Sequence, residues 1–336
     1  MMNYDFTQDI GKHFHSKVRK AYADTRACYI AGCPHKPINA HSITNNRLLK
    51  GISDDGNVMY MSTEQLQFGG RPDFVPTGRR KATAFPGFCD EHDKIFHPID
   101  NKDYTIGDQK QEFLFALRAS AKEYSTRQAV NNHLDGLIAE SKAALHEDKT
   151  DQFLLDSDGL KMMEIFRKGF VTGTQDLNIE RAIFNANLVN ENYWKIKTVT
   201  LEIDREYPIV AASTFKLERG LNGELINDIP DLRARAKPFY FTLFPQNGKT
   251  YCLLSWQQRD NRHYEHLSEL ANANEARKKV VASNLLCGYI ENFAANPTYW
   301  GKLPNSTKQE FDKYYGLSMR PASIPFVYDE DFSIFV

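Results

Sequence analysis

The sequence contains no long hydrophobic run. None of its 336 residues lies in an uninterrupted stretch of the roughly 18 apolar residues that span a membrane. The first residues also lack the basic region and apolar run of a secretory signal. Internal repeats and low-complexity tracts are absent as well. We therefore expect a globular, cytoplasmic protein that has no membrane partner.

An excess of positive charge is also missing. The chain has 42 Lys and Arg against 43 Asp and Glu, which gives a formal net charge of −1. Overall basicity therefore cannot indicate a nucleic-acid-binding protein, and a surface for nucleic acid would have to be local.

Cysteine is scarce, with five residues, an odd number. Cys252 and Cys287 lie among apolar residues and are expected to be small buried side chains in a reducing compartment, not disulfide partners. The other three cysteines fall within the first hundred residues, where a different chemistry is indicated.

Those three cysteines and one histidine form two pairs at knuckle spacing, Cys28-x4-Cys33 and Cys89-x2-His92. Thiolate and imidazole are the ligands that zinc prefers, and four of them complete a tetrahedral site. Gly and Pro residues beside each pair suit the tight turns that a knuckle needs. We predict a structural Zn²⁺ held by these four residues.

The ligand set has alternatives. His41 could replace Cys28, and His97 and His35 are further candidates for a place in the site. Chance clustering of ordinary core cysteines is the simplest competing explanation, although the local density of Cys, His, Gly and Pro argues against it.

Composition divides the chain into three regions. Residues 1–105 hold six of the ten histidines but little apolar material for a core, so we predict a zinc-knuckle module there. Residues 106–194 carry apolar side chains at helical spacing and predict a helical region. Residues 195–336 combine strand and helix patterns, which predicts a C-terminal antiparallel sheet covered by helices. The expected fold class is α+β.

Some elements are predicted more sharply than others. Residues 239–244 and 251–256 alternate as strands, and Asn247-Gly248 between them is a strong signal for a tight hairpin. Residues 68–87 are rich in Gly and Pro and are expected to form a loop, whereas residues 274–293 are expected to form a helix.

Three short runs in the first region follow one another in a characteristic order. Cys28 and Cys33 come first, Ala40-His41-Ser42-Ile43 follows, and the segment 88–97 contains Cys89, His92 and a terminal His97. This order resembles the zinc-knuckle HNH nucleases, a ββα-metal or treble-clef family, over about residues 26–100. The resemblance implies a β-hairpin followed by a helix and an endonuclease that hydrolyses phosphodiesters.

The same resemblance implies catalytic roles. His41 would be the general base that activates water, and Asp93 or His97 would help to hold a catalytic Mg²⁺ or Mn²⁺. The family usually carries an Asn shortly before the second knuckle, which orients the base. Here residues 83–87 contain no Asn, so the site is either an active variant or a degenerate one whose zinc only stabilises the fold.

Two basic clusters flank the predicted site and are candidates for binding phosphates. Their members are Lys17, Arg19 and Lys20 on one side and Arg79, Arg80 and Lys81 on the other. A solvated surface explains either cluster alone equally well.

These features lead to two function hypotheses. The first is a metal-dependent HNH-like nuclease, or a nucleic-acid-binding protein derived from one. By analogy, since such modular layouts occur in bacterial anti-phage systems, it would be a defence effector. The second is a non-catalytic regulatory or scaffold protein with a structural zinc site, whose C-terminal domain binds a protein partner.

Overall fold

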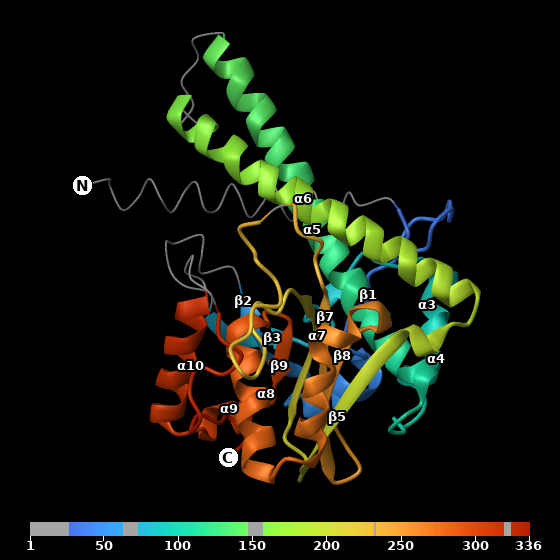
Figure 1. The fold of residues 1–336 in the computed structure, drawn as a ribbon, viewed down its shortest axis with the longest axis vertical. Helices are drawn as coiled ribbons and strands as arrows, with labels where there is room; N and C mark the ends of the chain where they lie inside the picture. The colour runs from blue at the N-terminus through green and yellow to red at the C-terminus, as the bar shows by residue number, and fades with distance from the viewer. Residues whose placement is uncertain (1–26, 63–72, 147–156, 232, 319–323) are drawn as a thin grey trace.

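A computed structural model describes residues 27–62, 73–146, 157–231, 233–318 and 324–336 (Figure 1). The predicted α+β class is confirmed, since long helices accompany a seven-stranded antiparallel sheet. The strand order in that sheet is β3-β2-β9-β6-β7-β8-β5. The strands span β2 Asn57–Ser62, β3 Asp73–Gly78, β5 Ile196–Asp204, β6 Ile209–Phe215, β7 Phe239–Gln246, β8 Lys249–Gln257 and β9 Phe293–Ala295.

The hairpin of β7 and β8 forms at the predicted turn. Gln246 pairs with Lys249, and Asn247 and Gly248 between them both have positive φ, 52° and 81°. Such angles are typical of the two-residue turns whose twist matches that of the flanking strands. Gly adopts this conformation without steric cost, which explains its place in the turn.

Three strands were not expected from the sequence. β3 lies inside residues 68–87, so the prediction of a loop there was wrong for residues 73–78. β9 lies at the end of the segment predicted as a helix to residue 293, since the helix α8 (Glu275–Tyr289) ends earlier. β2 and β3 come from the first predicted region, yet β2 pairs with β9 in the last one, so the sheet joins residues on both sides of the expected boundaries.

Helices cover both faces of the sheet. One face packs against α8 and α10 (Asn305–Ser318) in a large apolar core that includes Leu201, Phe241 and Leu285. The other face packs against α5 (Gln109–His146), which buries aromatic residues such as Phe113. The sheet is therefore the central layer.

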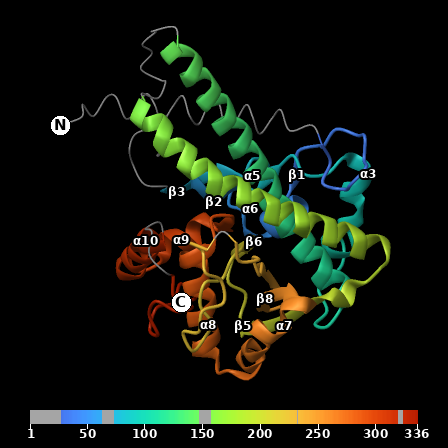
Figure 2. The ribbon, with the colours of Figure 1, turned by 45° about the horizontal axis from the view of Figure 1, so that its top comes forward.

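The helix α5 pairs with α6 (Ser157–Val189), and both extend beyond the body of the molecule at one end (Figure 1). Their other ends lie beside the small elements that carry the knuckle residues, as the turned view also shows (Figure 2). These elements are the two-stranded sheet of β1 (Ala40–His41) and β4 (Ala84–Phe85), and the short helices α3 (Asp90–Asp93) and α4 (His97–Asp100).

The remaining short elements connect the larger ones. They are η1 (Asn45–Leu49), α2 (Lys50–Ile52), η3 (Lys94–Phe96), η4 (Tyr193–Lys195), η5 (Gln258–Asp260), α7 (Asn261–Tyr264), η6 (Glu265–Asn272) and α9 (Pro297–Lys302). Within the described ranges, no helix is both long enough and apolar enough to cross a bilayer.

Candidate metal centre

The four predicted zinc ligands lie together. One ligand atom each from Cys28, Cys33, Cys89 and His92 can be chosen so that all four lie within 4.8 Å of one another. Cys33 Sγ is 3.7 Å from Cys89 Sγ, and His92 Nδ1 is 3.5 Å from Cys28 Sγ and 3.2 Å from Cys89 Sγ.

These separations match a tetrahedral ion. Bonds of about 2.3 Å to sulfur and about 2.0 Å to nitrogen place two sulfurs about 3.8 Å apart, and a sulfur and a nitrogen about 3.6 Å apart. A disulfide needs sulfurs about 2.0 Å apart, so the 3.7 Å separation excludes one between Cys33 and Cys89. The group can hold a metal ion such as zinc.

Backbone pairing brings the two knuckles together although 56 residues separate Cys33 from Cys89. Tyr29 N donates to Gly87 O at 2.7 Å, and Ile38 N donates to Phe88 O at 2.7 Å. A side chain at Gly87 could not be accommodated, because its Cβ would lie 2.1 Å from the Phe85 ring. Glycine at this turn therefore leaves room for the buried Phe85 ring beside the second knuckle.

Side chains of helix α6 form hydrogen bonds with the backbone of the first knuckle. Arg181 donates through Nε to Tyr29 O and through Nη2 to Cys28 O, the latter at 3.1 Å. Asn185 Oδ1 accepts from Ala31 N at 2.7 Å. These contacts fix the backbone of residues 28–31, the kind of support that commonly accompanies metal ligands.

The two buried cysteines differ in their proton affinity. Burial raises the pKa of the Cys28 thiol to about 11. Burial also acts to raise the pKa of Cys89, but hydrogen bonds from the His92 backbone and from the Cys33 thiol outweigh it, and the net pKa is lowered. Cys89 lies at the N-cap of α3, where backbone N–H groups favour a thiolate.

His41 lies outside the four-residue group, so the alternative ligand set that includes it is not the one assembled here. It sits on β1 opposite Ala84 of β4. Its Nδ1 is 3.1 Å from Ala82 O and 3.4 Å from Thr83 Oγ1. Burial lowers the pKa of His41, and the nearby charges of Arg118 and Arg79 lower it further against the opposing bond to Ala82.

The other two predicted catalytic residues follow on the helical segment. Asp93 is half-buried on α3, and burial raises its pKa although the charge of Arg118 opposes the shift. His97 is exposed at the start of α4 and contributes to the electrostatic environment of Asp93. Arg118 thus lies near both His41 and Asp93.

Arg118, on α5, is a site residue that the sequence did not reveal. Its guanidinium is buried, donates to both oxygens of Asp100 at 2.7 and 2.8 Å, and lies 4.0 Å from the centre of the Phe96 ring. The only hint in the sequence was the acidic character of residues 90–100, because the ion pair depends on tertiary packing.

The structure describes only one of the two predicted basic clusters. Lys17, Arg19 and Lys20 lie outside the described residues. Arg79 donates through Nη1 to the backbone and side-chain oxygens of Asn45, whereas Arg80 and Lys81 are exposed. Of these three cluster residues, Arg79 is the one whose charge contributes to lowering the pKa of His41.

The structure contains no second group of three or more metal-ligating side chains among the residues that it describes. Comparison with known proteins adds no further assignment: no family model, no curated protein and no solved structure matches this chain.

Proposed function

We propose that the chain is a metal-dependent, HNH-like nuclease in which the Cys3His group stabilises the site and His41 is the general base. One observation carries this proposal: among the residues that the structure describes, hydrogen-bond partners lie only at Nδ1 of His41. With Nδ1 as the donor to Ala82 O, Nε2 is left as the proton acceptor, and the lowered pKa keeps the ring neutral near pH 7.

The backbone carbonyl of Ala82 can take the orienting role of the Asn that this sequence lacks. A general base works well when a neighbouring group fixes its tautomer and its ring orientation. Ala82 O and Thr83 Oγ1 both lie within hydrogen-bond distance of Nδ1, on the strand segment that leads to the second knuckle. This geometry favours an active variant over a degenerate one.

The proposed reaction is the hydrolysis of a phosphodiester. His41 Nε2 takes a proton from water, the water oxygen bonds to phosphorus, the bond from phosphorus to the leaving sugar oxygen breaks, and that oxygen takes up a proton from solvent. A Mg²⁺ or Mn²⁺ ion would offset the charge that builds on the phosphoryl oxygens. Such ions use one or two carboxylates together with substrate phosphates, a role that Asp93 fits. The family resemblance assigns His97 as a further ligand.

The direct test is cleavage by the purified protein. Supercoiled DNA, single-stranded DNA and RNA would each be incubated with Mg²⁺ or Mn²⁺, and products resolved on gels. We expect His41→Ala to lower the rate at least about a hundred-fold, because general acid–base catalysis contributes that much. His35→Ala is the matched control, since His35 is exposed near the same knuckle.

The pH profile gives a second readout. Because the pKa of His41 is lowered, the acidic limb of the rate should have its midpoint below pH 6.5. Binding of nucleic acid without cleavage by wild-type protein would contradict the enzyme and favour the regulatory alternative. A His41→Ala variant as active as the control would remove His41 from the mechanism. The expected role in anti-phage defence stays a prediction.

A further inference from the structure

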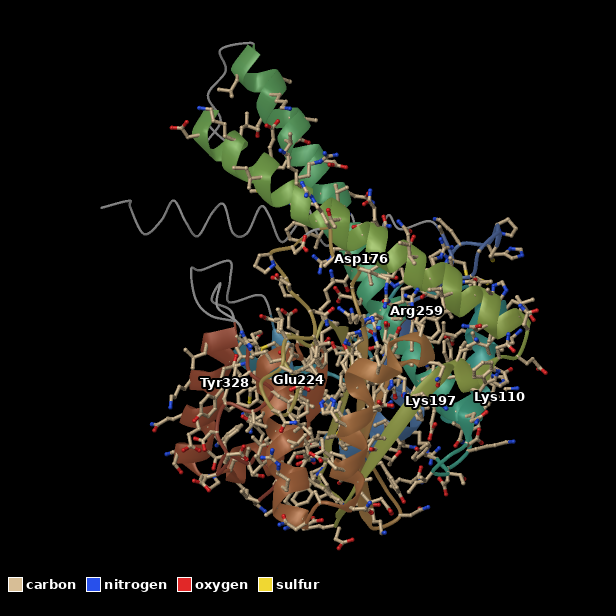
Figure 3. The ribbon with its side chains drawn as sticks, in the orientation of Figure 1. Lys110, Asp176, Lys197, Glu224, Arg259 and Tyr328 are labelled. Carbon is tan, nitrogen blue, oxygen red and sulfur yellow. The ribbon has the colours of Figure 1, made fainter. Side chains whose placement is uncertain are left out.

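A second group of cations, outside the Cys3His group, was not predicted from the sequence. Arg235 lies on the loop before β7, and Lys237 lies two residues further along the same loop. Arg259 belongs to η5 and Arg262 to α7. We call Arg235, Lys237, Arg259 and Arg262 the basic surface; Figure 3 marks its place by Arg259 and by Asp176 on α6.

Two of these four side chains, Arg235 and Arg259, pair with one carboxylate. Arg235 donates to both oxygens of Asp260, and Arg259 Nε is 3.8 Å from one of them. Asp260 is fully buried, whereas the side chains of Arg235 and Arg259 remain 46% and 38% exposed. The Asp260 carboxylate is therefore buried, whereas the side chains of Arg235 and Arg259 are partly exposed to solvent.

The acids that face this group do not balance it. Asp176 is paired with Lys216 at 2.7 Å, so its charge is already neutralised. Glu180, which lies within the electrostatic reach of Arg259, has its pKa raised to about 7 by burial. Arg235 and Arg262 both contribute to lowering the pKa of Lys237, after desolvation as the main cause. Asp260 accounts for the position of Arg235 and Arg259, but the group still carries more positive than negative charge, and like charges held this close repel.

Lys237, one member of the basic surface, is held in place by hydrogen bonds of its backbone and of its side chain. Asn227 accepts from Lys237 N at 2.9 Å, and the buried Tyr264 hydroxyl donates to Lys237 O at 2.7 Å. Lys237 Nζ donates to Ile226 O at 2.7 Å. A charged surface that is already ordered loses less entropy when a ligand binds.

An exposed aromatic ring lies on the neighbouring element. Trp194, on η4, is 45% exposed and is the only aromatic residue among the exposed large hydrophobic side chains of the described part of the chain. η4 packs against η5, which carries Arg259. Lys195 Nζ lies 4.0 Å from the centre of the Trp194 ring, so one face of the ring already carries a cation. An exposed aromatic ring near cationic side chains is a combination by which proteins bind single strands, through base stacking and phosphate contacts.

We propose that the basic surface, with Trp194 beside it, binds a single-stranded segment of nucleic acid. This inference rests on the nucleic-acid substrate proposed above, and assigns it a second contact region that the zinc knuckle does not supply. The cations would neutralise phosphates, and Trp194 would stack on a base.

The test measures binding without divalent cations, so that cleavage plays no part. Fluorescence anisotropy would follow a labelled 20-nucleotide single strand and a duplex of equal length over a series of salt concentrations. Two variants are compared with wild type: Arg259→Gln/Arg262→Gln, and Trp194→Ala. Lys308→Gln/Lys313→Gln, on α10, removes the same charge elsewhere. Thermal melting would verify that each variant is folded.

We expect the double Arg variant to bind the single strand at least about ten-fold more weakly and to lower its salt slope by about 1.4, whereas the α10 variant matches wild type. Trp194→Ala should weaken single-strand binding about ten-fold and duplex binding much less. Wild-type protein that binds neither oligonucleotide, or Arg variants that bind like the α10 control, would overturn the inference. Binding with these changes but no nuclease activity in any assay would reject only the enzyme.

Discussion

Glu180 is a buried carboxyl group outside the metal centre. It is only 4% exposed on α6, and one of its oxygens has no hydrogen-bond partner among the residues that the structure describes. Burial raises its pKa to about 7, although the hydroxyls of Ser120 and Tyr240 oppose the shift. The folded chain therefore keeps this proton at pH values where an unfolded glutamate has already lost it.

Glu180 therefore makes the free energy of unfolding fall as the pH rises. Between the unfolded pKa near 4.5 and the folded pKa near 7, the folded state binds more protons, so this group costs up to about 3 kcal/mol above pH 7. Glu180→Gln should raise the unfolding free energy at pH 8 and change it little at pH 5. Urea denaturation at both pH values measures the difference. An equal effect at both would mean that Glu180 is ionised in the fold.

Residues differ in how well the sequence reveals them. The Cys3His group could be predicted because each pair of ligands is local in sequence and zinc restricts the choice of partners. Arg118 and Asp100 could not, since 18 residues separate them and either one alone resembles an ordinary charged side chain. The carbonyl that orients His41 was equally hidden, because any residue supplies a backbone oxygen.

At the scale of elements, α6 acts as a support for the metal centre. Arg181 reaches the carbonyls of both Cys28 and Tyr29 from this helix. We expect Arg181→Ala to weaken zinc binding about 10- to 100-fold without removing a ligand. Competition with a chromophoric chelator would measure the affinity. Arg167→Ala, on the exposed part of the same helix, should leave it unchanged, and a similar loss in both variants would contradict the role of Arg181.

Elements with a local signal were predictable and the others were not. The turn residues Asn247-Gly248 made the β7–β8 hairpin predictable from the sequence. β9 has three residues and directly follows a helix pattern, so only its pairing with β2 and β6 makes it a strand. β3 contains Pro76 in a Gly- and Pro-rich stretch, but it lies at the edge of the sheet, where proline is tolerated.

At the scale of the whole molecule, the metal centre and the sheet are linked by topology. β2 and β3 lie in the sequence between β1 and β4, so the segment that joins the two knuckles also supplies two strands of the large sheet. Asn292, which precedes β9, donates to Ser42 beside His41 at 2.9 Å. A metal ion bound by the Cys3His group would therefore close a loop of the chain that includes β2 and β3 of the seven-stranded sheet.

The account depends most on a metal ion in the Cys3His group, and the zinc content of the purified chain tests this directly by mass spectrometry. We predict about one zinc ion per chain in wild type and in Cys252→Ala, whose cysteine lies in the sheet core, and a loss of most of it in Cys89→Ser. Less than about half an equivalent in the folded wild-type chain, or full retention by Cys89→Ser, would contradict the account.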